Sequence, residues 1–553
     1  MNCNKIKSIS IPLTILIFAI ILRILFFSGF ILCDDIQEIS TSIYVLENGP
    51  DLNDQFQLRF GGWLFNVFFF KLLGISELSF FVPTILISSL LSLVGYFLLK
   101  YWSYSKYQAF LGALLVASAP FEVLIGTLRA NDLIFSFLLI LGLFFFLIYE
   151  KRPVLQGALT GFLLWFAFYT KIWVLYSMPL LFGYYLIRII KKRWHGGLSF
   201  FMVSFFLHAT SCCIWKLKLG SFLPFIENHA ATYPIFTQDL LDLFEVYPKM
   251  IFHGSHLNTT FFGFIPYLLI FLILVKIILM KFSKRLHGLL KIDRLDIVLF
   301  MFYTSFFLFL NFFPNTFKFD QYYSVPRIFR YLTPLSFPMT LHLSKLVIDL
   351  VVAIKGVSLL KSNRLIKKYV LSGVFFILIV LNIFQVNEAT RPGRIYRNVL
   401  TSVVEDIRQE SPPAVLVESW VSYFIRNIYL KDLEEIEVVY IDDIYDAVDY
   451  EKWLQCNQDK LLDGTVMITG IGSCVHYGGY NDGFILKEFE DRLNSNWVLL
   501  KEYGTRSYLP EAESVGLWRW KQDVSLQPGK RQAIITSETS RRKICQCEYQ
   551  ERL

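Results

Sequence analysis

Residues Ile9 to Leu32 read ISIPLTILIFAIILRILFFSGFIL, and Cys33-Asp34-Asp35-Ile36-Gln37-Glu38 follows directly. The first stretch is apolar and long enough to cross a bilayer as a helix, which takes about 20 residues. No small-residue cleavage pattern comes after it, so we interpret it as a retained span that also directs insertion. The first predicted element is therefore a membrane span. Two adjacent carboxylates, Asp34 and Asp35, follow where the chain is expected to leave the membrane.

The composition of the whole chain indicates the same class. Of 553 residues, 55% are hydrophobic and 18% are charged, which is too apolar for one soluble core. The net charge of +8 could suggest a nucleic-acid partner. However, the lysines and arginines lie in short clusters between apolar runs and form no recognisable nucleic-acid-binding module. Membrane topology explains these clusters better.

Apolar runs of spanning length recur along the chain, and we expect about eleven spans. They lie near 9–32, 78–99, 107–124, 131–149, 153–170, 172–190, 197–217, 261–281, 295–314, 329–353 and 369–387. The basic segments between them, such as Lys281 to Arg294, fall on one side, which the positive-inside rule makes cytoplasmic. We therefore expect a cytoplasmic N-terminus and a C-terminal region on the extracytoplasmic side.

The composition changes to a soluble mix after the last predicted span. We predict a transmembrane domain over 1–388, an extracytoplasmic α/β domain over 389–524 and a disordered tail over 525–553. Alternating apolar runs predict the elements of the α/β domain. Strands are expected at 414–417, 437–441, 465–469, 497–503 and 515–520, and helices at 421–429 and 484–493.

The carboxylate pair Asp34-Asp35 has two interpretations. Asp35 with Glu38 three residues later matches a capping box, in which the two side chains satisfy exposed amides at a helix start. Asp34 lies one residue outside that cap and has no such local role. An acidic residue at a bilayer surface suggests proton abstraction beside a lipid-borne substrate. We predict that the pair is catalytic, with Asp34 as the general base.

Together with its surroundings, this pair resembles the GT-C superfamily of polyprenyl-phosphate-sugar-dependent glycosyltransferases. The resemblance is to the branch of the protein O-mannosyltransferases and the bacterial lipid A aminoarabinose transferases, and it covers roughly residues 9–345. It depends on the order and the outward placement of modest motifs. After Asp34-Asp35 these are Gly61-Gly62-Trp63, Leu72-Leu73-Gly74, Ser118-Ala-Pro120, Arg129-Ala-Asn-Asp132, Tyr169-Thr-Lys171 and Arg327-Ile-Phe-Arg330-Tyr331-Leu-Thr-Pro334.

The resemblance implies a membrane enzyme that takes a sugar from a polyprenyl phosphate. The acceptor would be a hydroxyl of a lipid, glycan or protein on the extracytoplasmic side, and transfer would invert the anomeric carbon. The protein would lie in the bacterial inner membrane and serve the cell envelope. A carboxylate, here Asp34, must remove the acceptor proton while cationic groups hold the departing phosphate.

Lys171 is the sharpest candidate for binding the phosphate. It lies at the end of a predicted span on the non-basic side, where a lysine usually has an anionic partner. The alternative is that its side chain snorkels to the interface. Arg327 and Arg330, three residues apart at the start of a predicted helix, would share one face and bind phosphate or, alternatively, lipid headgroups. Tyr323 is expected to donate to the same phosphate, although an interfacial aromatic belt also explains it.

Several residues are predicted to support the site. Arg129 and Asp132 could form a structural ion pair with each other or help to place Asp34. Arg59 lies in an amphipathic segment and could contact headgroups only. Glu38 belongs to the predicted cap. We expect no cofactor and no metal ion, and a divalent ion bound by Asp34 and Asp35 stays open as an alternative.

The main rival function is a transporter or flippase of lipid-linked glycans. Such a protein should place ionisable groups or broken helices near the bilayer midplane. In this sequence we expect the ionisable groups to gather at the outer edge, which favours an enzyme. A second rival is a non-catalytic assembly protein of the outer face, for which Asp34 would be dispensable.

Overall fold

The structure is a computed structural model that describes residues 3–29, 34–50, 55–128, 131–192, 194–222, 224, 240–252, 261–282, 290–312, 329–357, 364–418, 425–430, 436–441, 461–469, 497–504 and 514–521. The chain divides into two compact units. Unit 1 comprises Met1–Gly29 and Gln37–Arg391, and unit 2 comprises Phe30–Ile36 and Pro392–Leu553.

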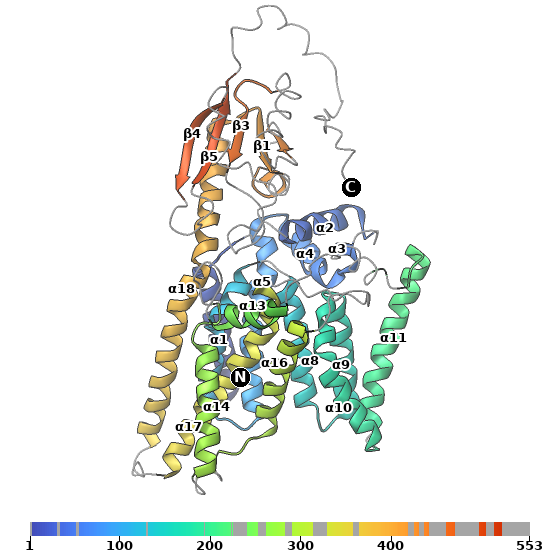
Figure 1. Cartoon of the computed structure of the whole chain (residues 1–553), viewed down its shortest axis with the longest axis vertical. Coiled ribbons are helices and arrows are strands. Elements are labelled where there is room, and N and C mark those ends of the chain that lie inside the picture. Colours follow the sequence, from blue (N-terminus) through green and yellow to red (C-terminus); the bar gives the residue numbers. More distant parts are fainter. Residues whose placement is uncertain are drawn as a thin grey trace, which may run out of the picture. The chain divides into compact units, whose positions relative to one another are not determined.

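Unit 1 is helical (Figure 1). Its long apolar helices pack side by side. The described helices, in chain order, are α1 (Cys3–Leu25), α2 (Asp34–Asn48), α3 (Gln55–Leu58), α4 (Phe60–Leu73), α5 (Glu77–Tyr101), α6 (Lys106–Ala117), α7 (Pro120–Thr127), α8 (Asn131–Ile148), α9 (Pro153–Phe168), the 3₁₀ turn η1 (Ile172–Tyr176), α10 (Met178–Ile190), α11 (Trp194–Leu219), α13 (Leu240–Phe252), α14 (Ile265–Phe282), α16 (Arg294–Phe312), the 3₁₀ turn η2 (Phe329–Leu332), α17 (Thr333–Val357) and α18 (Arg364–Glu410).

The predicted class of a multi-span α-helical membrane protein is confirmed. Six of the described helices are long and apolar enough to cross a membrane, or seven if α6 and α7 together form one span. The predicted count of eleven is not confirmed. Several predicted runs form shorter helices, among them Ser10–Leu25, Pro153–Phe168 and Pro179–Ile190.

The predicted span at 107–124 is broken between α6 and α7, whose axes differ by 55°. Pro120 cannot donate a backbone hydrogen bond, so carbonyls at the end of α6 lose their partners in the helix. The fully buried Arg23 of α1 supplies a donor, because its Nη1 lies 3.0 Å from the Ala117 carbonyl. Its Nε donates to Ser88 Oγ of α5 at 2.7 Å. One cation thus joins α1, α5 and the break.

Helices α9 and α11 approach closely through glycines. A Cβ atom at Gly157 would overlap the Gly196 carbonyl oxygen, and one at Gly161 would come within 3.0 Å of the Phe200 carbonyl oxygen. The spacing of Gly157 and Gly161 is the small-xxx-small pattern that lets membrane helices pack backbone to backbone. Helix α17 is largely buried among its neighbours.

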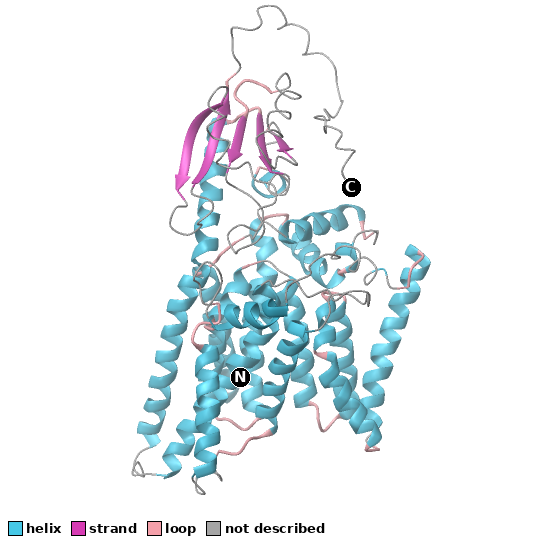
Figure 2. Cartoon of the chain, viewed as in Figure 1, coloured by secondary structure: helices cyan, strands magenta, loops and turns pink. Residues whose placement is uncertain are grey.

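Unit 2 contains a five-stranded mixed sheet in the order β2-β1-β3-β5-β4 (Figure 2). Its strands are β1 (Ala414–Glu418), β2 (Glu437–Ile441), β3 (Val466–Thr469), β4 (Trp497–Gly504) and β5 (Ser514–Trp520). β1 pairs in parallel with β2 and β3, whereas β5 is antiparallel to β3 and β4. All five strands were expected within a residue or two of these positions, so the predicted C-terminal sheet is confirmed.

The last turns of α18 belong to unit 2 and are tied to the sheet. Asp406 accepts hydrogen bonds from Lys501 Nζ at 2.7 Å and from the Tyr503 hydroxyl, and Glu410 pairs with Arg519. Of the helices predicted in this region, the structure describes a π-helical turn at Ile425–Tyr429. The predicted helix at 484–493 and the predicted tail at 525–553 lie outside the described residues.

Candidate functional site

Two cations from distant parts of unit 1, Lys171 and Arg330, meet at the carboxylate of Asp132. Lys171 Nζ donates to Asp132 Oδ1 at 2.5 Å, and Arg330 Nε lies 3.7 Å from Oδ2. Asp132 is 3% exposed, Arg330 5% and Lys171 7%. Each carboxylate oxygen faces a different cation, so a single aspartate orients both.

Two aromatic rings complete this cluster. The Lys171 ammonium lies 4.2 Å from the centre of the Tyr331 ring, within the range of a cation–π contact. The buried Trp173 ring packs against Tyr331 with 4.7 Å between ring centroids. We call Asp132, Lys171, Trp173, Arg330 and Tyr331 the Asp132 cluster. Aromatic walls keep water away and therefore strengthen the charge interactions inside.

Each charged residue stands where a helix begins. Asp132 occupies the first turn of α8, Lys171 directly precedes η1, and Arg330 lies in η2 immediately before α17. The first N–H groups of a helix have no partner in that helix, and together with the helix dipole they favour negative charge. The starts of α8 and α17 are therefore suited to an anion such as phosphate.

A backbone contact fixes the segment that leads into Asp132. Gly29 forms an isolated parallel bridge with Leu128, in which Gly29 N donates to the Thr127 carbonyl at 3.2 Å. Thr127 Oγ1 also donates to Ser28 Oγ at 3.1 Å. These contacts join the end of the segment after α1 to the end of α7.

The Gly61-Gly62 pair brings α4 against the same region. Gly61 N donates to the Tyr169 carbonyl at 3.3 Å. A Cβ atom at Gly61 would overlap Thr170 Oγ1, and one at Gly62 would overlap the Asn131 side chain. Thr170 precedes Lys171 and Asn131 precedes Asp132, so the missing side chains of the glycine pair let α4 pack directly behind both charged residues.

We expect Gly61→Ala to displace Thr170 and with it Lys171, because the added methyl group has no space. The free energy of unfolding should fall by about 1 to 3 kcal/mol, as for other overpacked sites. Thermal unfolding measures this effect. Gly183→Ala in α10, where a Cβ would meet no atom within 4 Å, is the control. Equal behaviour of the two variants would contradict this account of the glycine pair.

The structure places two of the predicted cations. Lys171 is buried against Asp132 and does not extend to an interface, which was the alternative considered for it. Arg330 lies in a 3₁₀ turn, and Arg327, with which it was predicted to share a helical face, lies outside the described residues. Arg129, the predicted partner of Asp132, also lies outside the described residues.

The remaining predicted site residues are resolved unevenly. Asp34 and Asp35 form the first turn of α2, so the helix starts before the predicted cap, but their side chains lie outside the described structure. Tyr323 is outside it as well. Arg59 and Glu38 are buried, at the start of α4 and within α2. Among the described residues, no three His, Cys, Asp or Glu side chains gather closely enough to bind a metal ion.

Some ionisable residues were not singled out by the sequence interpretation. Arg23, Lys276, Asp296 and Lys345 are all buried within apolar helices. The sequence analysis expected the ionisable groups at the outer edge and did not weigh these four. The signal was present in the sequence, because a charged residue inside a membrane span is costly and is usually retained for a partner.

No protein-family model and no curated protein matches the chain. Among solved structures, it is similar to the crystal structure of ArnT from Cupriavidus metallidurans bound to undecaprenyl phosphate, with 12% sequence identity, a TM-score of 0.48, and coverage of 91% of this chain and 97% of that chain. The apo crystal structure of ArnT from the same organism is similar at 11% identity and a TM-score of 0.49, covering 93% and 98%. At this identity and TM-score, the similarity assigns no role to any side chain of this chain.

Proposed function

We propose that this protein is a membrane glycosyltransferase that moves a sugar from a polyprenyl phosphate to an acceptor hydroxyl on the extracytoplasmic side. The observation that carries the proposal is the convergence of Lys171 and Arg330 on Asp132 at the starts of α8 and α17. Guanidinium and ammonium groups are the usual protein partners of phosphate oxygens, through charge-assisted hydrogen bonds. These groups would hold the donor phosphate as negative charge develops on it.

Asp34 is the proposed general base. An acceptor hydroxyl becomes a competent nucleophile as its proton passes to a carboxylate, while the bond between the anomeric carbon and the phosphate oxygen breaks. The proton ends on Asp34 and the electron pair on the departing phosphate. Attack from the face opposite the phosphate inverts the anomeric carbon.

Asp34→Asn should lower transfer by about 10²- to 10⁴-fold, the usual contribution of a general base. Binding of undecaprenyl phosphate should be unchanged, because the base does not hold the phosphate. The assay supplies purified protein with a panel of polyprenyl-phosphate sugars and follows release of polyprenyl phosphate by mass spectrometry. Asp35→Asn is the matched control and should retain more activity. Full activity of the Asp34 variant would refute the assigned base.

A flippase of lipid-linked glycans is the second candidate, and one observation favours it. Buried charges in unit 1, such as Lys276 of α14 and Asp296 in the first turn of α16, are of the kind that transporters use along a substrate path. Movement of a labelled polyprenyl-phosphate sugar across liposomes that contain the protein, without consumption of the donor, would support this function and contradict the transferase.

A further inference from the structure

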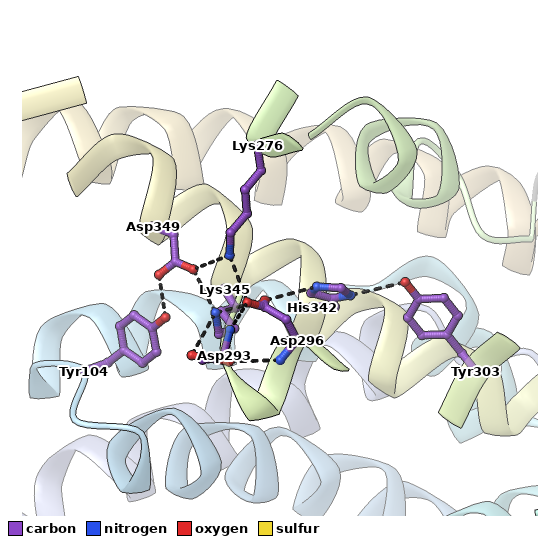
Figure 3. Close-up of polar contacts among 8 residues, drawn as sticks. All are labelled: Tyr104, Lys276, Asp293, Asp296, Tyr303, His342, Lys345 and Asp349. Carbon is purple, nitrogen blue, oxygen red and sulfur yellow. Dashed lines mark hydrogen bonds and ion pairs between the residues drawn. The ribbon is translucent and has the colours of Figure 1, made fainter. Parts of the chain in front are cut away.

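A second group of buried charges lies in unit 1, centred on Lys345 of α17. The side chain of Lys345 is 1% exposed, and its Nζ lies 2.8 Å from Asp349 Oδ2, 2.9 Å from Asp296 Oδ1 and 3.2 Å from Asp293 Oδ2. Lys276 of α14 approaches two of these carboxylates, at 2.9 Å from Asp296 and 3.2 Å from Asp349. Figure 3 shows these side chains pointing toward one another from three helices.

Hydrogen bonds extend this group at both ends. His342 Nε2 lies 3.3 Å from Asp296 Oδ1, and its Nδ1 lies 3.2 Å from the hydroxyl of Tyr303. At the other end, the Tyr104 hydroxyl donates to Asp349 Oδ1 at 2.5 Å (Figure 3). Burial and the adjacent Asp349 carboxylate raise the pKa of the Tyr104 phenol, so it stays a donor. We call these eight residues the Lys345 network: Tyr104, Lys276, Asp293, Asp296, Tyr303, His342, Lys345 and Asp349.

The Lys345 network is remote from the Asp132 cluster, yet both involve α17. Arg330 and Tyr331 directly precede α17, whereas His342, Lys345 and Asp349 follow on one face further along it. At 1.5 Å per helical residue, the distance along α17 from Arg330 to Lys345 is about 22 Å. The proposed transfer reaction therefore uses none of the network residues directly.

The energetics indicate what such a network is for. Removing charges from water costs several kcal/mol per ion, so a buried network is rarely retained for stability alone, and its best-attested role is to fix register. Register matters in a membrane, because neighbouring apolar surfaces and lipid chains offer almost the same contacts when a helix slides or turns. Paired charges at fixed positions, in contrast, lose their partners when a helix slides or turns.

We propose that the Lys345 network fixes the axial position and rotation of α17 against α14, α16 and the α5–α6 connection, and thereby places Arg330 and Tyr331 in the Asp132 cluster. A slip of one residue would move Arg330 by about 1.5 Å and turn α17 by about 100°. Pro338 lies between the two groups and permits a bend, but a bend does not absorb an axial slip. The network members are thus positioning residues, and their consequence for phosphate binding rests on the proposed function.

The test uses the full chain with two cations and two carboxylates of the network neutralised together, as Lys276→Met, Asp296→Asn, Lys345→Met and Asp349→Asn. The remaining carboxylate, Asp293, is 36% exposed and keeps its contact with water. Joint replacement of buried ion partners is often neutral for stability, so we expect a melting temperature close to that of the wild type. Hydrogen–deuterium exchange of Phe329–Leu332 should nevertheless accelerate on the order of tenfold, because η2 loses its fixed place. A control variant, Glu150→Gln in the half-exposed pair with Arg294, should leave this exchange unchanged.

A purely local structural role predicts faster exchange around residues 342–349 only, and that result would overturn the inference. Tyr104→Phe removes a single hydroxyl at the edge of the network and provides a variant that keeps every charge. It should accelerate exchange of Phe329–Leu332 in the same direction by a smaller factor, and unchanged exchange there would equally overturn the inference. Exchange needs no ligand, so failure of the wild type to bind undecaprenyl phosphate would refute the proposed function separately.

Discussion

Asp132→Asn should abolish most of the transferase activity, by a factor on the order of 10² or more, because the loss of a positioned group displaces both cations from the donor phosphate. It should also lower the free energy of unfolding by about 3 to 5 kcal/mol, since Lys171 and Arg330 are buried and would lose the carboxylate that faces them. Release of polyprenyl phosphate and thermal unfolding in detergent measure the two effects.

The matched control for Asp132 is Glu150→Gln, the same change of a carboxylate to an amide in an ion pair whose glutamate side chain is 50% exposed. An exposed pair contributes about 0 to 1 kcal/mol, so this variant should remain stable and active. If Asp132→Asn bound undecaprenyl phosphate with wild-type affinity, the role given to the Asp132 cluster would be wrong.

Arg23→Met should destabilise unit 1 by about 1 to 3 kcal/mol for each buried acceptor that loses its donor. Arg23 is fully buried and donates to Ser88 and to the Ala117 carbonyl, and Glu122 is close enough to interact with it electrostatically. Without the guanidinium, the Ala117 carbonyl loses this donor and the Glu122 carboxylate loses its cation. The melting temperature of the detergent-solubilised protein measures the loss.

A double variant separates the two contributions. Glu122→Gln should rescue part of the stability of Arg23→Met, because the uncompensated negative charge is removed together with the positive one. The coupling from the double-mutant cycle is expected at about 0.5 to 3 kcal/mol. Strictly additive effects would mean that Arg23 acts on the α6–α7 break alone.

The C-terminal sheet shows what the local sequence pattern can predict, namely the positions of the strands. Its five strands were expected at nearly the right residues, because short β-branched and aromatic runs bounded by turn residues form strands largely through local preference. The sequence analysis predicted no strand order, and the order β2-β1-β3-β5-β4 came from the structure alone. Which strands pair depends on contacts between segments that are far apart in the chain.

In unit 1, the apolar runs predicted helices, but several of these helices are shorter or more broken than the runs, so the predicted number of spans was not confirmed. The run at 107–124 is apolar throughout and still breaks before Pro120, because the backbone of proline outweighs hydrophobicity there. Arg23 interrupts the first apolar run, and a charged residue in such a run indicates a buried polar partner, here the Ala117 carbonyl.

The amino-acid sequence by itself determined the class of the protein: apolar runs long enough to span a bilayer, a soluble C-terminal region and the residue types suited to phosphate and proton transfer. Only the tertiary structure decided that Asp132, Lys171 and Arg330 meet, and that Lys345 is surrounded by carboxylates. The reason is physical. Hydrophobicity and backbone preference act along a few neighbouring residues, whereas the partner of a buried charge is set by how whole helices pack.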